Sequence, residues 1–258
     1  MTWKIVKLSL KSIFNNKMRS FLTMLGIIIG VMAVVILVSI TQGAASGITD
    51  SISNMGSQLI TASISDSDVT ISAEEIENLA SYPAVDSVAP VITAAETVKK
   101  NSNTGSYSIV GITPDYFSVL DVDIQRGRKI VESDLEWNTK VCVIGTDAAM
   151  DLFGTWDAVN GTIILGDSIY KVVGVLEEQG SSLAGSDDSR IFIPYSTAER
   201  MTGQTGVSSF YVKAAGENTV NAAINSIEGY LLQETRDEES YTVSNQSEVL
   251  DTMDDVTN

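Results

Sequence analysis

The sequence has 258 residues, of which 44% are hydrophobic, so it is long enough to bury a core and fits one or two domains. Its formal net charge is −17, yet residues 1–49 hold five of the 16 basic residues and no acidic one. The other 11 basic residues face 33 acidic ones, and a body with a net charge of −22 repels a polyphosphate backbone, so no nucleic acid is expected as a partner. With no histidine and one cysteine, the chain cannot build Ser-His-Asp or Cys-His catalysis, histidine-ligated zinc or an intrachain disulfide.

Residues 1–17 have the pattern of an amphipathic helix that lies on a membrane surface. Apolar residues recur at helical spacing from Trp3 to Phe14, and lysines flank this stripe. We expect a cytoplasmic interfacial helix whose cations meet anionic lipid headgroups; contact with a cytoplasmic partner is a compatible alternative. The membrane-surface basic residues are Lys4, Lys7, Lys11, Lys17 and Arg19.

Residues 18–43 are predicted to form a transmembrane helix. The run from Phe21 to Ile40 has no charge, and at about 1.5 Å per residue it reaches roughly 30 Å, the hydrocarbon thickness of a bilayer. Because the basic residues precede the run and the first acid, Asp50, follows it, the N-terminus is expected in the cytoplasm and the main domain outside. A cleaved signal peptide is the alternative, but the apolar run is longer than the usual core of about 7 to 15 residues. Gly26 and Gly30 are the predicted positions for close packing against another membrane helix.

Two strand–helix–strand units flank the middle of the chain. The first combines a strand at 58–64, a helix that Ser72 and Glu75 open as a capping box, and a strand at 85–97. The second combines a strand at 207–214, an amphipathic helix from Val220 to Leu231 and a strand at 241–244. We therefore expect residues 46–112 and 206–250 to form one α/β subdomain, followed by an acidic tail at 251–258.

Residues 113–205 are predicted to be a β-rich insertion into that subdomain. A strand at 141–144 precedes a helix that Thr146 would cap and that ends before Gly154. Strands at 162–165 and 168–176 are then joined by a two-residue turn, which is typical of a hairpin. The polar segment 179–189 is expected to be an exposed loop before a strand at 190–193. Its Asp187-Asp188 pair is a weak cation candidate, and a solvated loop is preferred because no flanking carboxylates complete a ligand spacing.

No catalytic, cofactor-binding or metal-binding residue is predicted. The sequence contains no Gly-Lys-Ser/Thr P-loop and no Gly-x-Ser-x-Gly elbow, so the chain is not expected to be an enzyme and needs no cofactor. Asp66, Asp68 and Glu77 match part of a calcium-loop spacing, but Ile71 stands where that loop needs glycine, and we reject the site. Cys142 lies in an apolar run and is expected to be a buried structural thiol.

Several segments resemble one family of membrane proteins. The run from Met18 to Gly43 resembles the first transmembrane segment of MacB-type ABC transporter permeases, which belong to the FtsX/LolC-like superfamily of lipoprotein-releasing and cell-division permeases. The segments 111–134, 152–154, 170–180 and 187–203 resemble the extracytoplasmic core domain of that family, in order. The resemblance covers nearly the whole chain and corresponds to the N-terminal half of such a permease. It implies an α+β fold in which one N-terminal transmembrane helix is followed by a porter-like α/β subdomain, interrupted by a β-rich inserted subdomain.

The resemblance also implies a function and partners. The chain would be an apparently truncated permease component of a MacB-type exporter or mechanotransmission complex, in which a separate ABC ATPase subunit drives movement of cargo outside the cytoplasm. Expected partners are that ATPase, a second permease copy or a C-terminal permease half, an adaptor of the membrane-fusion type, and membrane lipid. Such permeases have three more membrane helices after this domain, whereas the sequence stops at Asn258, so a truncated reading frame, a split permease and a partial sequence are all compatible.

Two alternatives to an exporter stay open. One is regulation of a cell-wall hydrolase, which other members of the same superfamily perform. The other is a single-pass, membrane-anchored binding or sensor domain, which would need no ATPase. In each case the chain is expected in the cell membrane with its main domain outside.

Overall fold

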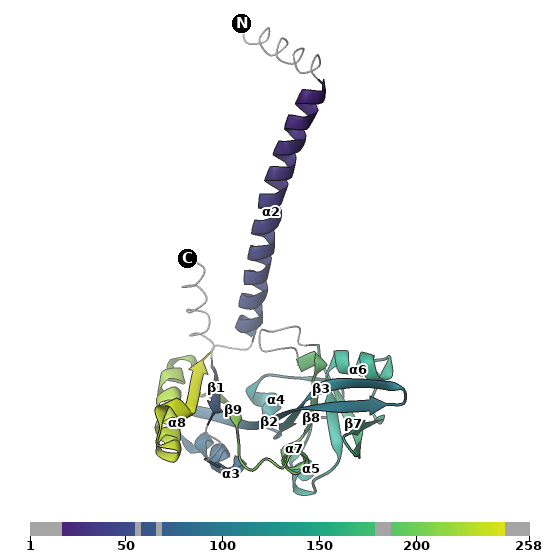
Figure 1. Ribbon diagram of the computed structural model, residues 1–258. Coiled ribbons are helices and arrows are strands. Elements are labelled where there is room, and N and C mark those ends of the chain that lie inside the picture. The colour runs from purple at the N-terminus through teal and green to yellow at the C-terminus, as the bar shows by residue number, and fades with distance from the viewer. Residues whose placement is uncertain (1–16, 55–57, 66–68, 179–186, 246–258) are drawn as a thin grey trace. The chain divides into compact units, whose positions relative to one another are not determined.

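The computed structural model describes residues 17–54, 58–65, 69–178 and 187–245 (Figure 1). The chain divides into two compact units, Met1–Asp50 and Ser51–Asn258. The first contains most of one long helix, and the second contains the strands and the shorter helices.

The long helix is α2 (Lys17–Asn54), which extends past both ends of the predicted segment 18–43. Its side chains are described continuously from Phe21 to Ile36, and all of them are exposed. Within the described residues, no helix is long and apolar enough to span a membrane. The predicted interfacial helix lies outside the described residues, except for Lys17 at the start of α2.

The two predicted strand–helix–strand units are present, and their strands interleave. The first unit consists of β1 (Leu59–Ile64), α3 (Ala73–Glu77), the 3-10 turn η1 (Asn78–Ser81) and β2 (Val85–Lys100). The second consists of β9 (Ser209–Ala214), η3 (Glu217–Thr219), α8 (Val220–Thr235), η4 (Glu238–Ser240) and β10 (Tyr241–Asn245). The strand order is β10-β1-β9-β2, and every neighbouring pair is antiparallel. This is a ferredoxin-like arrangement, in which a strand of the other unit separates the two strands of each unit.

Within the described residues, six strands lie between these units, and five of them form a closed ring with β2. The six are β3 (Asn103–Ile112), β4 (Ile124–Gly127), β5 (Val141–Ile144), β6 (Thr162–Leu165), β7 (Ser168–Leu176) and β8 (Ile191–Pro194). Pairing runs from β2 through β3, β8, β5, β7 and β6 back to β2. The closing contact is short, because β6 pairs with β2 only at Val98↔Leu165 and Lys99↔Ile164. β4 stays outside the ring and pairs with the last residues of β7.

Strand β2 takes part in both arrangements. It has 16 residues, and its first half pairs with β9 while its last residues pair with β6. Its opposite edge pairs with β3 from Val91 to Lys100. The sheet therefore runs without interruption from the α/β subdomain into the predicted insertion. The limits of that insertion, 113–205, stay a prediction.

Two buried clusters lie on opposite faces of this sheet. The larger one contains side chains from all six ring strands, together with α3, α8, α6 (Thr146–Phe153) and α7 (Tyr195–Thr202). The smaller one surrounds α4 (Tyr116–Val119), where the rings of Tyr116 and Phe192 lie 5.5 Å apart. Full burial of one large apolar side chain contributes about 1.5–3 kcal/mol to folding. Both clusters therefore stabilise the ring, one on each face of the sheet. The remaining short helices are α5 (Glu132–Glu136) and the 3-10 turn η2 (Asp187–Ser189).

Local sequence signals were good guides to most element boundaries. The capping box is present, since the Ser72 hydroxyl accepts a hydrogen bond from the Glu75 N–H at 3.3 Å and the Glu75 carboxylate accepts one from the Ser72 N–H at 2.8 Å. The hairpin of β6 and β7 has the predicted strands and turn. The mixed α/β fold is confirmed.

The predicted cap at Thr146 is wrong. The residue before the helix is Gly145, and Thr146 is the first helical residue, with a buried hydroxyl that has no hydrogen-bond partner within the described part of the chain. A Cβ atom at position 145 would lie 2.2 Å from the carbonyl oxygen of Asp188. Packing of η2 against Gly145 therefore sets the start of α6.

Candidate functional site

The exposed stretch of α2 is the first surface with a functional candidate. Its large apolar side chains from Phe21 to Ile36 are 40–67% exposed. A Cβ atom at Gly26 or at Gly30 would meet nothing within 4 Å, so the described part of the chain places no neighbour at either glycine. Of the predicted membrane-surface cations, Arg19 is exposed, while Lys4, Lys7 and Lys11 lie outside the described residues.

The Asp187-Asp188 pair is not the solvated loop that the sequence predicted. Both residues belong to η2; the Asp188 residue is 4% exposed, and the Asp187 side chain is 15% exposed. The Asp187 carboxylate lies 2.7 Å from Nη1 of Arg190 and accepts a hydrogen bond from the Tyr116 hydroxyl at 3.4 Å. Burial raises the pKa of Asp187, and the Arg190 charge opposes that rise. The local sequence did not predict the burial of this pair, because the burial depends on residues far away in the sequence, such as Tyr116.

No metal site emerges from the described residues, where no group of three His, Cys, Asp or Glu side chains could hold an ion. Asp66 and Asp68, from the rejected calcium register, lie outside those residues, and Ile71 is buried. Cys142 is fully buried in β5, as predicted. Its burial raises the pKa of the thiol far above the usual range, which makes Cys142 a structural residue.

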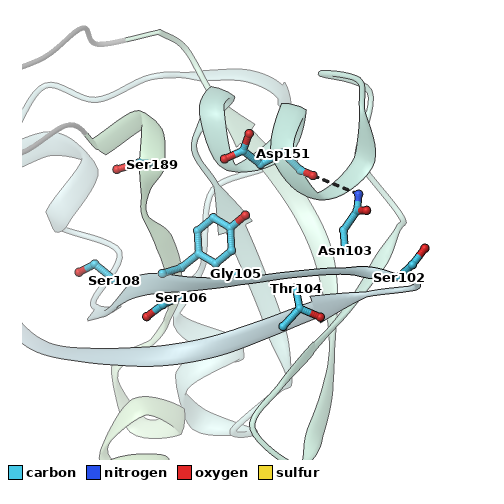
Figure 2. A pocket seen from close by; sticks show the side chains of 9 residues that line it. Ser102, Asn103, Thr104, Gly105, Ser106, Ser108, Asp151 and Ser189 are labelled. Atoms are coloured by element: carbon cyan, nitrogen blue, oxygen red, sulfur yellow. Dashed lines mark hydrogen bonds between the residues drawn. The ribbon is translucent and has the colours of Figure 1, made fainter.

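A polar hollow of about 660 Å³ lies between the β2–β3 hairpin, α6 and η2 (Figure 2). Asn103 fixes the hairpin to α6 by donating to the carbonyl oxygens of Asp151 and Leu152 at 3.1 and 3.2 Å. The ring of Tyr107 covers Gly105 so closely that a Cβ atom there would lie 2.8 Å from it. Burial and the Asp151 charge raise the pKa of Tyr107. The hollow offers hydroxyl, amide and carboxylate groups for hydrogen bonds, but no cation. Its lining is Ser102, Asn103, Thr104, Gly105, Ser106, Tyr107, Ser108, Asp151 and Ser189.

A second hollow, of about 440 Å³, lies where β4, β5 and β7 meet. Arg128 and Asp134 line it and form a bidentate pair, with Nη1 and Nη2 of Arg128 at 2.6 and 3.1 Å from the two carboxylate oxygens. The Val131 N–H and the Thr139 hydroxyl also donate to Asp134, at 3.1 and 3.0 Å. Burial works to raise the pKa of Asp134, but these hydrogen bonds outweigh it and lower the pKa. Sequence reasoning missed this pair, because an acid six residues after an arginine is an ordinary pattern.

Comparison with known proteins gives a consistent result. Residues 20–230 match the family model described as the MacB-like periplasmic core domain. The chain is 28% identical over 252 residues to the macrolide export ATP-binding/permease protein MacB of Acinetobacter baylyi, covering 93% of this chain and 38% of that protein. It is 30% identical over 249 residues to the protein of the same name from Vibrio parahaemolyticus, with the same coverage of 93% and 38%. The pyoverdine export ATP-binding/permease protein PvdT of Pseudomonas aeruginosa is 29% identical over 253 residues, covering 95% of this chain and 38% of PvdT.

Solved structures agree on the fold. The periplasmic region of MacB from Actinobacillus actinomycetemcomitans superposes with a TM-score of 0.67 at 19% identity, covering 81% of this chain and 98% of that structure. The extracellular domain of the ABC-type transporter YknZ from Gram-positive bacteria superposes with a TM-score of 0.61 at 19% identity, covering 72% of this chain and 100% of that structure. The chain spans about 38% of the length of the curated relatives described above.

Proposed function

Because the chain belongs to the family of MacB-like periplasmic core domains, we propose that it is a permease component of an ABC exporter and acts on cargo outside the cytoplasm. The observation that carries the proposal is the family match over residues 20–230, which takes in both the apolar part of α2 and the whole ring of strands. The relatives named as export permeases favour transport over regulation of a cell-wall hydrolase.

We further propose that residues 18–43 anchor the chain in the cell membrane with the N-terminus in the cytoplasm. Two observations support this. The apolar side chains from Phe21 to Ile36 are exposed in the described part of the chain, and lipid tails would cover them at no desolvation cost. All five cations of residues 1–49 precede the apolar run, which fits the excess of positive charge on cytoplasmic sides.

Energy for movement would come from ATP bound outside residues 1–258, since these residues contain no P-loop to hold its phosphates. We propose a separate ABC ATPase subunit, a permease partner that is either a second copy or a C-terminal half, and an adaptor outside the membrane. A single helix can transmit movement only if neighbouring helices fix its position. Gly26 and Gly30 would let such a helix approach closely, because each leaves open space where a side chain would stand. Macrolide-like or pyoverdine-like compounds are the cargo classes that the relatives' names suggest.

The test is export of a macrolide from cells that lack related permeases. The chain alone should confer none, and co-expression with a matching ATPase and permease partner should restore it. Gly30→Ile should weaken the restored export, whereas the control Met32→Ile should not, because position 32 lies about 200° around the helix from position 30. Export by the chain alone, or equal export by both variants, would contradict the proposal.

A further inference from the structure

Strand β7 has a break in its pairing along one edge. β6 pairs with residues 168–171 of β7 and β4 pairs with residues 174–176, so neither strand covers Val172 and Val173. Three backbone hydrogen bonds satisfy these two residues instead: Asn160 N–H donates to the Val172 carbonyl, Val172 N–H to the Gly161 carbonyl, and Arg128 N–H to the Val173 carbonyl, each at 2.9 Å. The second hollow lies at this break. Its volume of about 440 Å³ is within the range of small-molecule sites, about 300–1,000 Å³.

Part of the lining of this hollow is apolar. Val141, Val159 and Val173 line it, and Val173 is 9% exposed. Gly127 lets β4 close against β7, since its φ is +89° and a Cβ atom there would lie 2.2 Å from the Val173 carbonyl oxygen. Most side chains are excluded at that position by both the conformation and the space. The wall beside Val173 is thus made of backbone.

The charged side chains of the lining carry a net positive charge. Arg128 and Lys171 are cations and Asp134 is the single carboxylate, giving a net charge of +1 on a body whose net charge is −22. Asp134 neutralises Arg128 and fixes its orientation, and three of the five N–H groups of Arg128 donate to Asp134 and to the Lys129 carbonyl. The other two N–H groups of Arg128 have no hydrogen-bond partner among the described residues.

Lys171 supplies the uncompensated charge. Register places its side chain on the outer face of the ring, between Val141 of β5 and Thr162 of β6. Within the described residues, the Lys171 ammonium has no ion pair and no hydrogen bond. Lys171 is therefore free to pair with an anion that enters the hollow, because no carboxylate of the described residues pairs with it.

We propose that this hollow binds a small organic anion with one carboxylate on an apolar body. Lys171 pairs with the carboxylate, the free N–H groups of Arg128 donate to it, and the three valines cover the apolar part. One uncompensated cation matches one negative charge, and the acidic body disfavours a polyanion. The site is independent of the exporter assignment, because it requires binding alone.

The experiment uses three probes of matched size: 4-fluorobenzoate, the neutral 4-fluorobenzamide and the cationic 4-fluorobenzylamine. Binding to the full chain in lipid nanodiscs is followed by fluorine NMR, with empty nanodiscs as the background. The benzoate should bind about tenfold more tightly than the amide, which corresponds to about 1.4 kcal/mol, and the amine should bind most weakly.

Lys171→Gln should remove the benzoate's advantage over the amide, and Lys171→Arg should retain most of it. Lys99→Gln is the matched control, because it removes the same charge from the outer face of the ring without lining the hollow. Circular dichroism melts establish that each variant is folded. Equal binding of benzoate and benzamide by the wild-type chain, or wild-type benzoate binding by folded Lys171→Gln, would overturn the proposal.

Discussion

Replacement of Asp134 by asparagine should destabilise the strand-rich body substantially. The Asp134 side chain is 6% exposed and accepts four hydrogen bonds, two of them from Arg128. Removing one partner of a fully buried ion pair costs about 3–5 kcal/mol. The Arg128 side chain is 45% exposed, so water can solvate it after the substitution, and we expect about 2–3 kcal/mol instead. For a body of this size that loss lowers Tm by about 4–12 °C.

The effect should depend on pH in one direction. Since folding lowers the pKa of Asp134 below its usual value of 3.8, the carboxylate stabilises the fold above that value. The difference in Tm between wild type and Asp134→Asn should thus be constant between neutral pH and about pH 5, and shrink as pH falls through the folded pKa.

The assay is a thermal melt of the full chain in nanodiscs, followed by tryptophan fluorescence. Asp123→Asn is the control, because it removes the same charge from a side chain that is 73% exposed and paired with Lys129 at 3.1 Å. Such an exposed pair is worth about 0–1 kcal/mol. If Asp134→Asn lowers Tm no more than Asp123→Asn does at neutral pH, the reasoning about the buried carboxylate is refuted.

Three further predictions concern topology, folding and packing. A cysteine placed at residue 2 should resist labelling from outside intact cells, and a mature protein that begins near Ser46 would contradict the proposed anchor. Residues 46–250 expressed alone should give a circular dichroism spectrum with both helix and strand and one cooperative melt; a disordered spectrum would count against an independent body. Phe210→Ala, at a fully buried position of β9, should cost about 3–5 kcal/mol in denaturant unfolding, whereas Leu232→Ala, at a position 39% exposed, should cost far less, and equal losses would disprove this account of the core.

The sequence was informative wherever a short stretch of chain decides the structure. Ser72 and Glu75 satisfy each other's groups within one helical turn, so their pattern alone located the start of α3. The Gly166-Asp167 turn fixed the register of β6 and β7 for the same reason, because the turn leaves one compatible pairing. Resemblance to known permeases then supplied the family, which periodicity could not do.

Contacts between distant segments were beyond such reasoning. Ring closure depends on two residue pairs that join β2 to β6 across more than 60 positions of the sequence. No local pattern near Val98 predicts these pairs. Thr146 had the right chemistry for a cap, but the approach of η2 to Gly145 decided the geometry. In the sequence, Lys171 looks like any exposed lysine of a strand. Only the structure shows that it lines a hollow, which lies at the break between β4 and β6.

The double use of β2 sets a rule for anyone who wants to build chimeras from this domain. A graft that replaces residues 113–205 with the equivalent segment of a relative would keep the host's β2 and β3, and these two strands are one third of the ring. The foreign strands would then have to pair with an edge that did not evolve with them, at Val98 and Lys99 on one side and along β3 on the other. The pairing of β2 with β9 ends at Val91, and its pairing with β3 begins there. An exchange point near Val91 would therefore transfer the β2–β3 hairpin along with the other ring strands. Module boundaries in this fold are thus better drawn through the middle of a strand than through the loops that flank the insertion.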